Sequence, residues 1–81
     1  MTKDEVREKV FNLVSSQLGI PIDDTFGTKG FVADLNTDSL DTVELTMEVE
    51  DLFKIVIEDQ EADMLSTPDQ VVEFVFKRLN S

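Results

Sequence analysis

Ser39 lies among carboxylates in the segment D-S-L-D-T-V-E-L, which spans residues 38–45. A serine hydroxyl becomes a nucleophile when a neighbouring base takes its proton, and this chain contains neither His nor Cys. We therefore expect no self-activated catalysis at Ser39, and we do not expect the chain to be an enzyme. A hydroxyl at the junction of a loop and a helix is accessible to other proteins. The segment thus predicts that an outside enzyme modifies Ser39.

The length and composition predict one small domain over residues 1–81. A domain of this size buries only about 60% of the surface of its unfolded chain, which leaves room for one core. The lack of Cys excludes disulfides and thiolate zinc sites, and it fits a reducing compartment. No apolar run is long enough to span a membrane, and the first residues do not resemble a signal peptide. We expect a soluble, cytoplasmic monomer.

The charge of the chain predicts the kind of partner. Eighteen acidic residues against seven Lys and Arg give a formal net charge of −11. From Asp34 to Glu73 there are thirteen acids and one base, Lys54. Such a surface repels nucleic acid and anionic membranes and attracts basic protein surfaces.

The first predicted helix begins after Thr2, which forms a capping box with Glu5, and it ends at Gly19. Its apolar residues recur at helical spacing: Val6, Val10, Leu13, Val14 and Leu18. A long connection follows over residues 20–37. Its apolar residues predict an ordered loop that packs on the core: Ile20, Ile22, Phe26, Phe31, Val32 and Leu35.

The second predicted helix begins at residue 38 or 39, ends at residue 53 and carries two apolar stripes. We assign the core side to Leu45, Val49, Leu52 and Phe53, and the solvent side to Leu40, Val43 and Met47. An extended link at residues 55–57 and a short helical turn at 59–65 follow. The last helix has Thr67 as its N-cap, Pro68 at its first position and Gln70 at its third. Its inward residues are Val71, Val72, Val75, Phe76 and Leu79. The predicted fold is an all-α, small four-helix bundle of three longer helices and one short one.

The segment around Ser39 resembles the prosthetic-group attachment site of acyl carrier proteins. The resemblance extends over essentially the whole chain, including F-V-A-D-L at 31–35, E-V-E-D-L-F at 48–53 and I-E-D-Q-E-A at 57–62. It implies that Ser39, next to Asp38 of the motif, carries 4′-phosphopantetheine donated by coenzyme A. The chain departs from the usual pattern in having Asn36-Thr37 for Gly-Ala and Glu58 for Pro. These departures concern the loop conformation and the choice of partner.

The residues after the serine resemble the fatty-acid type of carrier, which holds growing acyl chains as thioesters on the arm. The resemblance implies a phosphopantetheinyl transferase (holo-ACP synthase) as one partner. Other implied partners are malonyl transferase, ketosynthase, reductases, dehydratase and acyltransferases. The residues expected to contact partners are Leu40, Asp41, Val43, Glu44, Met47, Glu48, Glu50 and Asp51. Candidates for lining the acyl chain are Phe31, Leu45, Val49 and Val72.

Two other interpretations remain open at this point, and a third, calcium binding, does not fit the sequence. The chain could be a specialised polyketide or D-alanyl carrier, or an unmodified acidic module that docks a basic protein. The spacing of Asp34, Asn36 and Asp38 matches the start of an EF-hand, but the sixth position is Ser39 instead of Gly and the twelfth is Leu45 instead of Glu. We therefore expect no specific metal site, and only weak divalent association at Asp34, Asp38 and Asp41.

Overall fold

The computed structural model describes residues 1–31, 33–35 and 37–80, and only the backbone of Ser39. Over this part of the chain the elements are α1 (Lys3–Leu18), the 3-10 turn η1 (Phe26–Thr28), α2 (Ser39–Phe53), α3 (Asp59–Asp63) and α4 (Pro68–Leu79). The described residues form no strand. The predicted all-α fold with three longer helices and one short helix is confirmed.

The capping predicted for α1 is present at both ends. The Glu5 N–H donates to the Thr2 hydroxyl at 3.2 Å, and the Thr2 N–H donates to the Glu5 carboxylate at 2.8 Å. The backbone bond from Thr2 is the main reason that the pKa of Glu5 lies below its ordinary value. Gly19 ends the helix with φ of 67°, and its N–H donates to the Ser15 carbonyl at 2.8 Å. A left-handed backbone at this position favours glycine.

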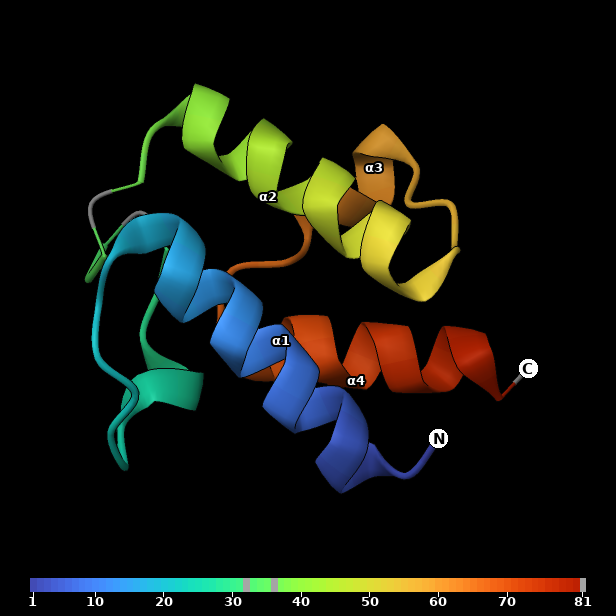
Figure 1. The fold of residues 1–81 in the computed structure, drawn as a ribbon. Helices are drawn as coiled ribbons and strands as arrows, with labels where there is room; N and C mark the ends of the chain where they lie inside the picture. The colour runs from blue at the N-terminus through green and yellow to red at the C-terminus, as the bar shows by residue number, and fades with distance from the viewer. Residues whose placement is uncertain (32, 36, 81) are drawn as a thin grey trace.

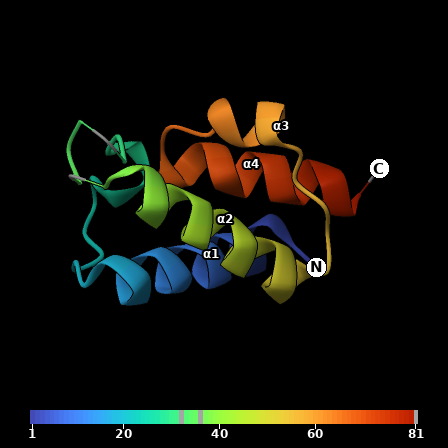
Figure 2. The ribbon, with the colours of Figure 1, turned by 90° about the horizontal axis from the view of Figure 1, so that it is seen from above.

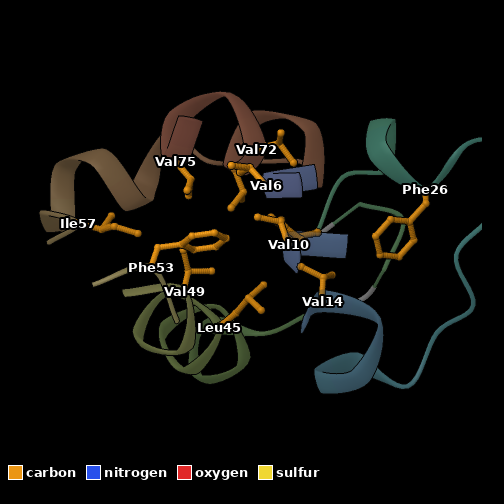
Figure 3. Packing of buried hydrophobic residues seen from close by; sticks show 12 residues of the cluster. Val6, Val10, Val14, Phe26, Leu45, Val49, Phe53, Ile57, Val72 and Val75 are labelled. Carbon is orange, nitrogen blue, oxygen red and sulfur yellow. The ribbon is translucent and has the colours of Figure 1, made fainter. Parts of the chain in front are cut away.

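The core lies where α1 crosses α4 beneath α2 (Figure 1). Helix α1 packs most extensively against α4 and also contacts α2. Valines of α1 and α4 supply much of the buried surface, and side chains of α2 face them (Figure 3). The buried valines of the two helices are Val6, Val10, Val14, Val71, Val72 and Val75. Removing these side chains from water is the main force that holds the helices together.

The loop between α1 and α2 is held by two buried phenylalanines. Phe26 opens η1 and is fully buried, with its ring edge-on to Phe11 at a centroid distance of 4.9 Å. Phe31 is buried as well, so the prediction of a packed loop holds for these two anchors. Ile20 and Leu35 are partly buried, but Ile22 is exposed, and its predicted role as an anchor was wrong. Val32 and Asn36 lie outside the described residues.

Helix α2 begins and ends within the predicted bounds. Its N-cap is Asp38, and Lys54 caps its C-terminus with φ of 57°, the only positive φ of a non-glycine residue in the described part of the chain. Leu45, Val49 and Phe53 are buried as predicted. Leu52 is exposed, against the prediction, because Phe53 and Ile57 fill the core at this end of the helix. Leu79 in the last turn of α4 is also exposed instead of inward.

Helix α3 is shorter than predicted, and none of its side chains is fully buried. Side chains of its neighbours hold it and the link before it. The Arg78 guanidinium of α4 donates to the Val56 carbonyl at 2.7 Å and pairs with Glu61 at 2.5 Å. From above, α3 lies on the α4 side of α2 (Figure 2). Polar contacts thus help to hold α3 in place, together with the packing of Ala62 against the core.

No helix in the described part of the chain is long and apolar enough to cross a membrane.

Candidate functional site

Ser39 is the first residue of α2. This helix begins at the end of the long loop (Figure 1). The residues on either side form a capping box. The Asp41 N–H donates to the Asp38 carboxylate at 2.9 Å, and the Asp38 N–H faces the Asp41 carboxylate at 3.4 Å. The two carboxylates that flank Ser39 therefore also fix the direction in which the helix begins.

The loop before Ser39 is anchored through its backbone. The Phe31 N–H donates to the Ser66 carbonyl at 2.9 Å, and the Thr37 N–H donates to the Phe31 carbonyl at 3.0 Å. Thr37 is only 6% exposed, and its hydroxyl oxygen has no hydrogen-bond partner among the described residues. Buried polar atoms in proteins are normally bonded, so this hydroxyl is an unusual feature of the site.

A groove of about 770 Å³ runs between α2 and α3, beginning beside the residues that precede Ser39. Both polar and apolar side chains line it. They are Thr37, Asp38, Thr42, Val43, Thr46, Met47, Glu50, Ile57, Asp59, Ala62 and Asp63. The Glu50 carboxylate within the groove accepts a hydrogen bond from the Ile57 N–H at 2.8 Å, which ties the link before α3 to α2.

A second, much smaller cavity lies deeper, with a volume of about 20 Å³, room for about one water molecule. Its lining is mainly apolar: Phe31, Thr42, Leu45, Thr46, Val49, Ile57, Ala62, Leu65 and Val71. Four of these residues, Thr42, Thr46, Ile57 and Ala62, also line the groove and so form the wall between the two spaces.

Three of the four expected acyl-lining residues, Phe31, Leu45 and Val49, surround this inner cavity. Val72 does not line it, because its side chain packs into the core and the neighbouring Val71 faces the cavity instead. Sequence analysis missed the four wall residues. The helical spacing of α2 gave no information on which residues of α3 face Thr42 and Thr46.

The outer face of α2 carries the predicted apolar trio. Leu40, Val43 and Met47 are 66%, 54% and 58% exposed. The acidic side chains of Glu44, Glu48 and Asp51 are exposed as well.

Two of the expected partner-contacting residues are only half exposed and are engaged within the fold. Asp41 belongs to the capping box, and Glu50 binds the Ile57 N–H. Their carboxylates have structural roles in addition to any role in docking.

The described residues contain no cluster of three or more side chains that could hold a metal ion. Asp34 accepts a hydrogen bond from the Gly30 N–H at 2.8 Å, while Asp38 and Asp41 serve the capping box. Weak divalent association at these three carboxylates stays a prediction.

Comparison with known proteins identifies the family. Residues 8–75 match the family model described as "Phosphopantetheine attachment site". An acyl carrier protein of Cyanidium caldarium is 42% identical over 81 residues, which cover 100% of this chain and 94% of the relative.

Two further relatives, also named acyl carrier protein, agree in length and sequence. That of Chlorobium phaeobacteroides is 38% identical over 96% of this chain and 100% of its own length. That of Guillardia theta is 39% identical over 98% of both chains. On this evidence the chain belongs to the acyl carrier proteins, which are carriers rather than enzymes and have phosphopantetheine as their prosthetic group.

Proposed function

We propose that Ser39 is the attachment residue, with its hydroxyl oxygen joined to 4′-phosphopantetheine through a phosphodiester. The family match, which spans Ser39, supports this assignment most strongly. The motif D-S-L that resembles the family's attachment site stands at residues 38–40, and the backbone places Ser39 at the first position of α2. The chain lacks His and Cys, so the thiol that holds the cargo is supplied by the arm.

The surroundings of Ser39 suit such a group. The first turn of a helix presents N–H groups and a partial positive charge, both of which favour a phosphate, although here the Asp41 N–H is already bonded to Asp38. The groove between α2 and α3 begins beside Asp38 and offers both threonine side chains and apolar surface to an arm of mixed polarity. The buried hydroxyl of Thr37, which has no partner among the described residues, lies two residues from the proposed attachment point.

The proposed role is delivery of acyl thioesters to the enzymes of fatty-acid synthesis in the cytoplasm. The exposed trio on α2 gives a partner an apolar anchor, and the acidic residues beside it attract Lys and Arg on that partner. The proposed docking residues are Leu40, Asp41, Val43, Glu44, Met47, Glu48, Glu50 and Asp51. Resemblance to the fatty-acid type of carrier favours this role over a polyketide or D-alanyl pathway.

Intact-mass measurement after reaction with coenzyme A and a phosphopantetheinyl transferase tests the attachment residue. The wild-type chain should gain the mass of one arm, and Ser39→Ala should gain none. Ser66→Ala is the matched control, because Ser66 is an exposed serine outside the motif, and it should be modified like wild type. Modification of Ser39→Ala would refute the assignment. A wild-type chain that stays unmodified would instead favour the unmodified docking module.

A further inference from the structure

The hydroxyl of Thr37 is a hydrogen-bonding group that none of the described residues uses. Its oxygen is buried, and the described residues offer it no partner. An unpaired buried hydroxyl destabilises a fold, whereas valine has the same shape without this cost. The hydroxyl is therefore available to a partner that the described residues do not supply.

The position of Thr37 limits what that partner can be. Its backbone is fixed by the bond to the Phe31 carbonyl, and it lines the end of the groove where α2 begins. Two residues of extended chain span at most about 7 Å, so Thr37 and Ser39 are close neighbours. Threonine can exchange its methyl and hydroxyl by rotating about χ1, with no movement of the backbone. A group bound to Ser39 at the mouth of the groove is within reach of the hydroxyl after such a rotation.

The charge at this site favours a neutral donor. The carboxylates of Asp38 and Asp41 already flank Ser39, and an anionic phosphodiester would add a third negative charge beside them. Like charges at close range repel, and the described acidic segment has Lys54 as its only base. A hydroxyl donates a hydrogen bond to a phosphate oxygen without bringing a cation that would pair with Asp38 instead.

We infer that Thr37 is a positioning residue for the prosthetic group. Its hydroxyl donates a hydrogen bond to the phosphodiester on Ser39 and so holds the arm at the mouth of the groove between α2 and α3. This inference rests on the proposed attachment at Ser39. It concerns a residue at which the chain departs from the Gly-Ala usual for the carriers it resembles. Thr37 thus makes the arm less mobile than a carrier with alanine at this position would.

The test compares apo and modified forms of wild type, Thr37→Val and Thr37→Ser, after mass spectrometry has shown that each is modified. Modification should raise the melting temperature of wild type and Thr37→Ser by about 4–8 °C more than that of Thr37→Val, the shift expected from one hydrogen bond in a domain of this size. The phosphorus-31 chemical shift of the modified protein should differ between wild type and Thr37→Val, and Thr37→Ser should restore the wild-type shift. Thr46→Val is the control, because its hydroxyl also lines the groove but already donates to the Thr42 carbonyl at 2.9 Å.

A measurement on the wild-type chain makes the test independent of the folding of any variant. Scalar couplings of Thr37 should report a different χ1 population in the modified protein than in the apo protein. Equal temperature shifts and equal phosphorus spectra for wild type and Thr37→Val, or an unchanged χ1 in wild type, would overturn the inference while leaving the attachment at Ser39 intact. Failure of the wild-type chain to gain the arm would overturn both, and the mass measurement detects that case separately.

Discussion

Replacing Arg78 by Met should loosen α3 more than any other part of the molecule. The guanidinium of Arg78 donates to the Val56 carbonyl at 2.7 Å, pairs with Glu61 at 2.5 Å and lies 4.8 Å from the ring centre of Phe74. The first two contacts join α4 to the link before α3 and to α3 itself, whereas the contact with Phe74 lies within α4. Methionine keeps an apolar stem of similar length but loses all three polar contacts.

The magnitude follows from the exposure of the groups involved. The Arg78 and Glu61 side chains are 35% and 31% exposed, so their ion pair contributes no more than about 1 kcal/mol. The hydrogen bond to the Val56 carbonyl contributes about 1 kcal/mol, and the contact with the aromatic ring about 0.5 kcal/mol. We expect Arg78→Met to lower the free energy of unfolding by about 2 kcal/mol, which corresponds to roughly 10 °C in melting temperature.

Lys77→Met is the matched control. Lys77 precedes Arg78 on α4, is exposed, and its loss changes the net charge by the same amount. Thermal unfolding by circular dichroism gives the overall effect, and amide hydrogen exchange shows where it occurs. Exchange should accelerate most at residues 59–63 in Arg78→Met and remain near wild type in Lys77→Met. Equal melting temperatures for the two variants, or an increase in exchange spread evenly over all helices, would refute the tethering role of Arg78.

Three further predictions concern charge. Reversing Glu44 and Asp51 to Lys should slow association with a phosphopantetheinyl transferase in stopped-flow measurements, and added salt should weaken the binding of the wild-type chain. The same reversals at the exposed Glu8 and Asp24 serve as the control and should have little effect. Equal association rates for the two double variants would exclude α2 as the docking face. Magnesium at millimolar concentration should raise the melting temperature more than sodium chloride of equal ionic strength, because thirteen acids repel one another between residues 34 and 73. A melting temperature that does not change with the concentration of either salt would contradict this prediction. Folding lowers the pKa of Glu5. The contribution of this carboxylate to stability is therefore fully present above the pKa that Glu5 has in the unfolded chain, and it is lost as the pH falls through the lower pKa that Glu5 has in the folded protein. Glu5→Gln should therefore lose less stability than wild type over that acid range, and parallel curves of melting temperature against pH would contradict the assignment.

Local signals in the sequence predicted the boundaries of the helices well. Thr2 with Glu5, Gly19, and Thr67 with Pro68 each act through hydrogen bonds or backbone conformations within a few residues, and each is present in the structure. The exposed stripe of α2 was also predicted correctly, since helical spacing fixes the direction in which a side chain points.

The errors arose where burial depends on what lies opposite. Helical spacing put Leu52 and Leu79 on inward faces, but spacing cannot tell which side chains of a terminal turn the rest of the fold covers. Ile22 lies in an irregular segment that has no period from which its direction could be predicted. The turn η1 has three residues, too few to produce a pattern.

The sequence pointed to individual residues of the candidate site, but it did not predict which residues the fold brings together. The sequence correctly predicted the exposed face of α2, whereas the attachment at Ser39 beside its acidic neighbours stays a prediction. It could not place α3 opposite Thr42 and Thr46, because α3 has five residues and is held by Glu50 and Arg78 from other helices. Contacts between residues distant in sequence leave no periodic signal. For the same reason the unpaired hydroxyl of Thr37 became visible only in three dimensions.

Lys54 combines a left-handed backbone with a positive charge, and the two features favour different residues at this position. A left-handed conformation costs a residue with a side chain about 1–2 kcal/mol, and glycine would avoid that cost. Lys54 nevertheless puts a positive charge at the C-terminal end of α2, where it interacts favourably with the helix dipole. It is also the one base among thirteen acids between residues 34 and 73. Glycine at this position would relax the backbone, but it would also remove the one positive charge from the most acidic part of the molecule. The backbone conformation therefore favours glycine at residue 54, whereas the charge balance favours lysine.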